Sequence, residues 1–431
     1  MKNPIKVGLL GLGTVGKGVC RLLTGNAENI SQKICTDLEI AGILVHDLKK
    51  PRDITINQKL LTDSYNDLID NPGIDIIIEV MGGIHPALEY VTQALKKRKC
   101  VVTANKNLIA LHGKELFEAA QENHVDLLFE GSVGGGIPII KPLKQCLAAN
   151  RLQKIMGIIN GTTNYILTKM TLEGKSLSLS LSEAQAKGYA EADPASDIEG
   201  LDAAYKLSIL ASIAFNSRVS LEDVHIEGIS KINERDILYA KELGYIIKLL
   251  AIAKDTDEGI EARVHPTFVP EGHPLSAVND VYNAIFVQGD AIGETMFYGR
   301  GAGEMPTASA VVSDVMDAAR NILYGVPGSI GCTCYEQKSV LPIGFVESKY
   351  YLRLLVADRP GVLASIAYAF GDKGVSLASV IQKNTDRKLA ELVMITHQVK
   401  EQNLQDALKV IEKLPAVDKI SNVIRVEGEN D

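Results

Sequence analysis

The densest group of polar residues that could do chemistry lies in the stretch EADPASDIEGLDAAYK, residues 191–206. Asp202 and Lys206 are four residues apart, so a helix would place both side chains on one face. A lysine held by carboxylates at a cleft could donate a proton to a reacting oxygen. The alternative is an ordinary ion pair, which stabilises a helix by only about 0.3–0.5 kcal/mol. Spacing alone favours this second interpretation.

A second candidate is the glycine-rich stretch VGLLGLGTVGKGV, residues 7–19, in which an apolar strand runs into Gly-x-Gly-x-x-Gly and then a helix. Gly11 would allow the tight turn, Gly13 would let the backbone approach a pyrophosphate, and Gly16 would let the helix pack closely on the strand. The phosphates would bind the N–H groups at the start of the helix. The alternative is a glycine turn without a ligand, which the position directly after a strand disfavours. The turn residues predicted to bind the cofactor are Gly11, Gly13, Thr14, Val15 and Gly16.

The end of the second predicted strand bears on the choice of cofactor. It reads LVHDLKKPR, so that His46 comes first, followed by Asp47 and then by Lys49, Lys50 and Arg52. A carboxylate here would bind the ribose 2′-hydroxyl of NAD, whereas cations suit the 2′-phosphate of NADP. We interpret the stretch as favouring NADP and leave NAD open.

A lysine and a run of glycines follow two later strands. Lys106 comes just after the strand in VVTANK, at the edge where open α/β sheets bind ligands. It could contact cofactor or substrate, or be a solvated charge. In FEGSVGGGIPII, residues 129–140, three consecutive glycines could turn backbone groups toward a ligand or form a hinge.

The elements that must position these residues predict an α/β protein with three parts. Over residues 1–136, strands that are apolar on both faces alternate with amphipathic helices, which predicts a doubly wound Rossmann-type domain. Residues 137–330 predict an α+β domain for substrate binding and dimerisation, whose helix at about 306–324 could pack back onto the first domain. Residues 349–425 read strand, helix, strand, strand, helix, strand, the ferredoxin-like order.

Composition excludes several classes of function. The 431 residues carry a net charge of -8 without a block of Lys and Arg, so we expect neither nucleic acid nor anionic membrane as a partner. No apolar run reaches about 18 residues and no secretory signal is visible, so we expect a cytoplasmic protein. The six cysteines are expected to be reduced, and Cys332-x-Cys334 lacks partners at zinc-ligand spacing.

Taken together, the motifs resemble the homoserine dehydrogenase family in its monofunctional form. The matching stretches occur in the order GLGTVGKGV, EVMGG, TANKNLIA, EGSVGGGIPII, NGTTNYILTKM, EADPASDIEGLDAAYKL and GRGAGEMPTASAVVSD, and they cover about residues 1–330. The tail from about residue 349, with ADRPGVLASIAYAF, resembles an ACT domain.

The resemblance implies an NAD(P)-dependent interconversion of L-aspartate 4-semialdehyde and L-homoserine, a step toward threonine and methionine. It implies Lys206 as the proton donor, with Glu191 and Asp202 binding the amino end of the substrate. Lys106 would lie near the nicotinamide and the substrate. It also implies a cofactor site lined by Gly188 and Gly303, and a sodium ion held by Glu130 and the backbone carbonyls of Val133, Gly135 and Ile137. His46 stands where many family members carry arginine against the 2′-phosphate, which leaves NAD use open.

For the tail, the resemblance implies a small amino acid bound between paired copies, with threonine as the expected inhibitor. The turn from Asp358 to Gly361 would meet the effector, and the chain would form a homodimer or homotetramer. An oligomerisation module without effector is the alternative. Two other functions remain open at this point: an inactive nucleotide-binding amino-acid sensor, and a dehydrogenase of another amino-acid semialdehyde.

Overall fold

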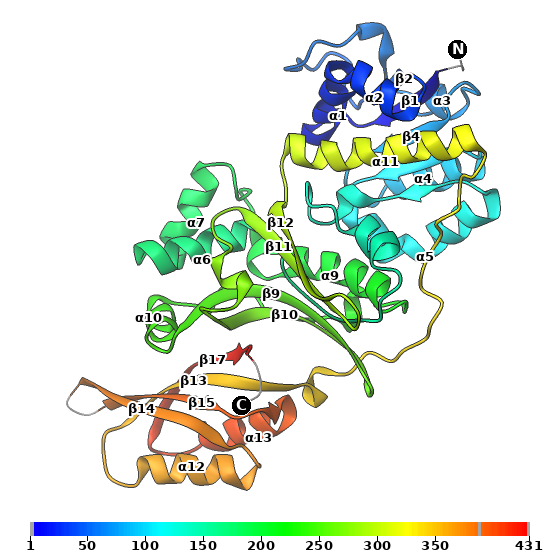
Figure 1. Cartoon of the computed structure of the whole chain (residues 1–431). Helices are drawn as coiled ribbons and strands as arrows, with labels where there is room; N and C mark the ends of the chain where they lie inside the picture. Colours follow the sequence, from blue (N-terminus) through cyan, green and yellow to red (C-terminus); the bar gives the residue numbers. More distant parts are fainter. Residues whose placement is uncertain (1–3, 387–388, 429–431) are drawn as a thin grey trace. The chain divides into compact units, whose positions relative to one another are not determined.

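The computed structural model describes residues 4–386 and 389–428, and its elements are labelled in Figure 1. The chain folds into two compact units. The first comprises Met1–Leu152, Ser208–Leu221 and Asn283–Gln337, and the second comprises Gln153–Leu207, Glu222–Tyr282 and Lys338–Asp431. Each unit therefore contains segments that are far apart in the sequence.

A parallel sheet forms the centre of the first unit. Its order is β3-β2-β1-β4-β5-β6, and each neighbouring pair is parallel. β4 and β5 are buried at every residue, including the polar Glu79 and Thr103 at their ends. The order reverses direction between β1 and β4, the position at which such sheets bind ligands. The strands are β1 (Ile5–Leu10), β2 (Leu38–Leu44), β3 (Leu61–Thr62), β4 (Ile76–Glu79), β5 (Cys100–Thr103) and β6 (Leu127–Leu128).

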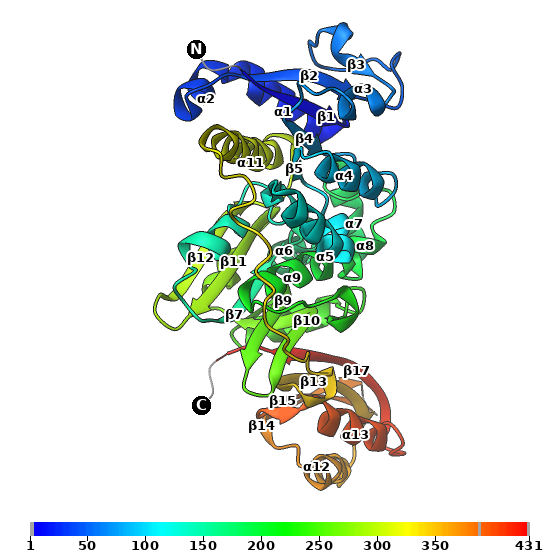
Figure 2. The same cartoon turned by 90° about the vertical axis from the view of Figure 1, so that its right-hand side faces the viewer.

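Helices cover this sheet, and the long helix α11 (Glu304–Tyr324) packs against α1 (Thr14–Gly25) (Figure 2). The packing requires Gly18, because a Cβ there would lie 2.7 Å from Glu304 O and 2.8 Å from Ala308 Cβ. The other helices here are α2 (Ala27–Ile34), α3 (Asn66–Ile69), α4 (Ala87–Lys96), α5 (Lys106–Asn123) and a π-helical stretch, Pro142–Cys146. Short 3₁₀ turns lie at Gln58–Leu60 and Glu130–Ser132. Two further strands, β11 (Tyr282–Gly289) and β12 (Gly293–Arg300), pair with each other.

In the second unit, one sheet runs through two parts of the chain. Its strands follow the order β7-β9-β10-β17-β13-β15-β14, with β8 paired to β10 and β16 to β13. They are β7 (Leu152–Ile158), β8 (His225–Ile226), β9 (Tyr245–Thr256), β10 (Gly259–Pro270), β13 (Glu347–Ala357), β14 (Leu377–Asp386), β15 (Leu389–Thr396), β16 (Val399–Lys400) and β17 (Val417–Val426). The helices are α6 (Gly161–Glu173), α7 (Leu177–Ala186), α8 (Ala195–Ile198), α10 (Glu234–Glu242), α12 (Val362–Asp372) and α13 (Glu401–Ile411), while α9 (Leu201–Ala214) begins here. Further 3₁₀ turns lie at Leu221–Asp223, Pro274–Ala277 and Ile343–Phe345.

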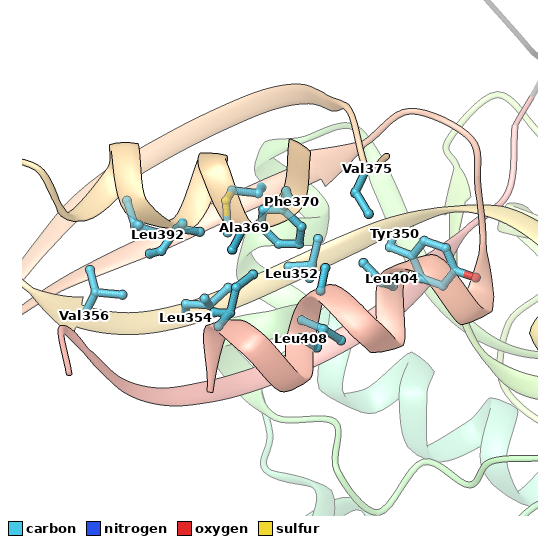
Figure 3. Close-up of a cluster of buried hydrophobic side chains, with 14 of the residues drawn as sticks. Tyr350, Leu352, Leu354, Val356, Ala369, Phe370, Val375, Leu392, Leu404 and Leu408 are labelled. Carbon is cyan, nitrogen blue, oxygen red and sulfur yellow. The ribbon is translucent and has the colours of Figure 1, made fainter. Parts of the chain in front are cut away.

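The C-terminal part has the predicted order β13, α12, β14, β15, α13, β17. Figure 3 shows its core, in which Leu352 and Leu354 of β13 meet Phe370 of α12 and Leu404 of α13. All four side chains are at most 1% exposed. This core makes the C-terminal part a folded layer of helices on a sheet rather than a tail.

The C-terminal sheet joins β10 through β17. The two strands are parallel, and they pair Thr267 with Arg425 and Phe268 with Val426. Next to this junction, the buried Arg353 donates to Asp236 of α10 over 2.8 Å and to Glu391 of β15 over 3.0 Å. Backbone pairing and buried charges therefore hold the C-terminal part to α10 and β10.

No described helix combines the length and the apolar character needed to cross a membrane.

Candidate active site

The first candidate site is the turn after β1, in the first unit. Gly11 has a φ of +99°, a conformation that favours glycine. A Cβ on Gly16 would lie 2.2 Å from Gly11 O, so that only glycine fits where α1 passes the turn. Gly13 caps α1 without a side-chain hydrogen bond, and the space beside its Cα is open. The N–H groups at the start of α1 thus face room for a phosphate.

This turn borders a groove of about 880 Å³ at the reversal point of the sheet. The groove is large enough for a cofactor. Among the predicted cofactor residues, Gly11, Gly13, Thr14 and His46 line it, whereas Val15, Gly16, Lys106, Gly188 and Gly303 do not. The groove is also lined by Lys17, Asp47, Lys50 and Arg52, and by Val80, Met81 and Gly82 after β4. Four of the residues that the sequence singled out after β2, His46, Asp47, Lys50 and Arg52, therefore line one groove, whereas Lys49 does not.

A buried carboxylate supports the far wall of this groove, and the sequence analysis missed it. Glu79 is fully buried, and it accepts hydrogen bonds from Met81 N at 2.8 Å and from Gly82 N at 3.2 Å. Thr103 Oγ1 donates to its other oxygen over 2.5 Å. Burial raises the pKa of Glu79, and these three hydrogen bonds counteract the rise. The available signal was an acidic residue that ends the apolar run IDIIIE.

The same network reaches Lys106 through Asn105. Asn105 Nδ2 donates to Gly83 O over 2.6 Å, and its Oδ1 accepts from Leu108 N at 3.1 Å, so it caps α5. Lys106 is the first residue of α5, directly after this cap. The position of Lys106 at the end of a strand agrees with the prediction, while its contact with a cofactor stays a prediction.

A separate candidate site is the lysine cluster in the second unit. Lys206 Nζ donates to Asp202 Oδ2 over 2.7 Å and to Ile159 O over 2.8 Å. The side chains of Lys206 and Asp202 are only 11% and 7% exposed. The pair is therefore not the ordinary solvated ion pair that the spacing alone favoured, because both charges are withdrawn from water.

Asn160 completes this cluster and was also missed. Its Nδ2 donates to Asp202 Oδ2 over 2.8 Å and to Asp197 Oδ1 over 2.7 Å. Its Oδ1 accepts from Thr163 N at 2.9 Å and so caps α6. One side chain thus starts a helix and fixes two carboxylates, one of which holds Lys206. The available signal was an asparagine between an apolar strand and the helix of NGTTNYILTKM.

The other predicted substrate and cofactor residues lie on loops, Glu191 and Gly188 in the second unit and Gly303 in the first. Glu191 is exposed between α7 and α8, where Gln185 Nε2 donates to its backbone carbonyl over 3.1 Å. Gly188 follows α7 with a φ of +73°, and Gly303 caps α11 with a φ of +124°. The structure therefore brings Asp202 and Lys206 together and leaves Glu191 on an exposed loop in the same unit.

The predicted cation loop is buried and tightly folded. Gly134 and Gly135 have φ values of +73° and +54°, and a Cβ on Gly135 would lie 2.4 Å from Gly301 O. The carboxylate of Glu130 points to backbone amides instead, accepting from the N–H groups of residues 139, 140 and 141 over 2.5, 2.8 and 2.7 Å. Within the described ranges, no three side chains of His, Cys, Asp or Glu gather as metal ligands. A cation here would have to rely on backbone carbonyls.

The predicted effector turn follows β13. Gly361 caps α12 with a φ of +89°, and Asp358 Oδ1 accepts from Gln382 Nε2 at 3.2 Å. Both residues lie at the surface. The turn is thus open to a ligand or to another chain.

The sheet order and the groove beside the glycine turn define a Rossmann-type dinucleotide-binding protein. Comparison with known families identifies which one. The family described as homoserine dehydrogenase matches residues 138–316, its NAD-binding domain matches residues 11–130, and the ACT domain matches residues 350–416. The chain belongs to the homoserine dehydrogenase family, whose members are oxidoreductases that use NAD(P).

Individual relatives agree over the whole length. The homoserine dehydrogenase of Bacillus subtilis is 44% identical over 98% of this chain and 98% of its own. That of Synechocystis is 46% identical over 98% of this chain and 99% of its own. The crystal structure of the Thiobacillus denitrificans enzyme matches with a TM-score of 0.93 at 44% identity, covering 99% of this chain and 98% of the other.

A shorter archaeal homoserine dehydrogenase, solved in complex with NADPH, matches with a TM-score of 0.62 at 27% identity and covers 73% of this chain and 98% of its own. The resemblance drawn from the motifs, the α/β fold class and the enzyme class are thereby confirmed. The comparisons do not favour the alternative of an inactive sensor.

Proposed function

We propose that the chain interconverts L-aspartate 4-semialdehyde and L-homoserine, with NADP(H) as its preferred cofactor and Lys206 as the proton donor. The observation that carries this proposal is the buried cluster in which Asp202 and the carbonyl of Ile159 hold the ammonium of Lys206. An ammonium has three N–H donors. Two of them have described partners, and the third is available for the oxygen of a substrate.

The chemistry of the reduction needs such a donor. A bound nicotinamide dinucleotide supplies the hydride, which leaves negative charge on the oxygen of the aldehyde. Lys206 stabilises this charge and then transfers its proton to the oxygen. Asp202 and Glu191 bind the ammonium group of the substrate and fix its orientation.

The groove beside the glycine turn fits the cofactor, since Gly16 admits no side chain and Gly13 opens onto free space. Lys17, Lys50 and Arg52 line the groove and would attract a 2′-phosphate, and this supports NADP. His46 and Asp47 lie among them, so NAD remains the cofactor to compare. Lys106 would be the second ammonium near the nicotinamide.

Two finer proposals concern an ion and an effector. The tight turn at Gly134 and Gly135 suits a sodium ion held by neutral oxygens, which would be the backbone carbonyls of Glu130, Val133, Gly135 and Ile137. The surface turn from Asp358 to Gly361 supports binding of a small amino acid, threonine first, between paired ACT domains of a homo-oligomer.

The test is a steady-state assay of homoserine oxidation, followed by the absorbance of the reduced nicotinamide, with NADP and NAD in parallel. Lys206→Met should lose turnover by a factor of at least 100 while NADPH binding, measured by fluorescence titration, stays within twofold. Lys187→Met is the matched control, because Lys187 forms an i,i+4 ion pair with Glu183 but is 47% exposed. It should keep full activity.

The outcomes separate the parts of the proposal. Near-normal turnover of Lys206→Met would refute the role of Lys206. Absence of turnover with either cofactor in the folded wild-type chain would refute the reaction itself. A higher kcat/KM with NAD than with NADP would refute only the cofactor preference.

A further inference from the structure

Two cysteines outside the candidate active site share one small cavity. Cys332 and Cys334 lie on the segment after α11, and they line the cavity together with Phe117, Lys144 and Arg218, all within the first unit. The cavity holds about 20 Å³, roughly the room for one water molecule. A bulky ligand does not fit there, whereas a bond between the two sulfurs requires no additional space.

Polar and charged groups surround the sulfur of Cys332. Arg218 Nη2 donates to Cys332 Sγ over 3.5 Å, and Lys144 Nζ donates to the carbonyl of the neighbouring Gly331 over 2.9 Å. Cys334 lines the same cavity. The neighbouring Cys334, followed by the charges of Arg218 and Lys144, outweighs burial and lowers the pKa of Cys332 to about 5. This shift favours the thiolate of Cys332, the form that attacks disulfides.

Cys334 is the complementary partner. Its contact with Cys332, together with burial, raises its pKa, so it keeps its proton while Cys332 is ionised. Its Sγ lies 3.6 Å from Ser212 O of α9. Cys332 is exposed and Cys334 is half-buried. An exposed thiolate beside a second thiol is the arrangement of an attacking and a resolving cysteine.

The remaining cysteines have different surroundings. Cys20 and Cys100 are buried, and burial raises the pKa of their thiols to about 11 and about 12, so both are inert. Cys35 and Cys146 are exposed. These two provide internal comparisons for a reaction at Cys332.

The backbone spacing allows a bond between the pair. Residues two apart have Cα atoms at most about 7 Å apart, and disulfides span Cα distances up to about 6.8 Å. The spacing of the two residues is therefore compatible with a disulfide.

We propose that Cys332 and Cys334 form a reversible disulfide by exchange with a low-molecular-weight disulfide of the oxidised glutathione type. The thiolate of Cys332 attacks one sulfur of the small disulfide, whose S–S bond breaks and releases one small thiolate. Cys334 then loses its proton to solvent and attacks the Cys332 sulfur of the mixed disulfide. The second small thiolate leaves as the Cys332–Cys334 bond forms. The protein loses two electrons and the one proton of Cys334 overall, and the small disulfide is reduced to two thiolates, which take up protons from solvent.

The experiment uses the full chain in a Cys35→Ser, Cys146→Ser background, so that Cys332 is the exposed thiol under test. The protein is incubated with oxidised glutathione, quenched with N-ethylmaleimide and mapped by mass spectrometry. We expect a peptide linked between residues 332 and 334, which dithiothreitol reverses. Adding Cys334→Ser should trap glutathione on residue 332, and adding Cys332→Ser should abolish both products.

A rate measurement tests the cause of the reactivity. In the wild-type chain, modification of Cys332 should be at least tenfold faster than that of Cys146 at pH 7. Its rate should change little between pH 6.5 and 8.5, whereas the rate of an ordinary thiol rises up to about pH 8.5. Arg218→Gln should slow the modification of Cys332 alone. The proposal is overturned if Cys146 reacts first, or if Cys332 and Cys334 stay reduced under excess oxidised glutathione.

Discussion

Asn160 allows a direct test of the lysine cluster. The substitution Asn160→Asp removes the N–H donors of the side chain but keeps the oxygen that caps α6. In Asn160→Asp, the retained oxygen can still accept from Thr163 N and start α6, since Asp is as good an N-cap as Asn. In the wild-type chain, the side-chain nitrogen of Asn160 donates to Asp197 over 2.7 Å and to Asp202 over 2.8 Å. A carboxylate oxygen in its place would lose both hydrogen bonds and would face two like charges.

The expected magnitude follows from those two bonds. A hydrogen bond to a charged group contributes about 1.5–3 kcal/mol, so the pair accounts for about 3–6 kcal/mol. Each 1.36 kcal/mol is about a factor of ten in rate. If losing this free energy disturbs the positions of Asp202 and Lys206, kcat/KM for homoserine falls by a factor of about 100 or more. Asn160→Ser keeps an N-cap and adds no charge, so its loss should be smaller.

The assay is steady-state homoserine oxidation, combined with thermal unfolding and NADPH titration of each variant. NADPH binding should persist, because the groove beside the glycine turn does not include Asn160. Asn160→Asp with activity within threefold of wild type would refute the argument. A loss of activity that merely parallels unfolding of the variant would show that Asn160 acts only as a cap.

Three further predictions concern stability and cofactor binding. Arg353→Met leaves the buried Asp236 without its guanidinium, while Glu391 keeps its ion pair with Arg235. The free energy of unfolding in urea should therefore fall by about 3–5 kcal/mol; an unchanged midpoint would contradict this. Burial raises the pKa of Glu427, but three nearby cations lower it below its usual value. Its stabilisation is therefore full above the unfolded pKa of about 4.3 and is lost progressively as the pH falls from there toward the lower folded pKa. Glu427→Gln should therefore destabilise at pH 7 and destabilise less at pH 3, as followed by calorimetry. Gly16→Ala should abolish NADPH binding in titration, because its Cβ would lie 2.2 Å from Gly11 O; tight binding by the folded variant would contradict this.

The sequence predicted those features whose signals are local. The glycine turn, the parallel sheet and the order of the C-terminal elements each follow from patterns within a few residues, and the structure has all three. The contact between Asp202 and Lys206 follows from one turn of helix. Their burial does not, because it depends on how other segments pack around them.

The features that the sequence did not reveal depend on partners far along the chain. Asn160 reaches Asp197 and Asp202, which are 37 and 42 residues away. Arg353 pairs with Asp236 at a separation of 117 residues. No periodicity links such positions, since only the folded topology brings them together. The sequence of the C-terminal part predicted the fold of an ACT domain. It did not predict that the last strand, β17, would pair with β10.

The junction between β10 and β17 constrains how this enzyme can be shortened. A truncated chain that ends before β13 would leave Thr267 and Phe268 of β10 at an open strand edge. It would also uncover the ring of Phe268, which stacks on Tyr351 at 4.4 Å. An apolar open edge promotes aggregation. Deleting the ACT domain would therefore require a charged or proline substitution on β10, a modification that point mutations within the turn from Asp358 to Gly361 do not need.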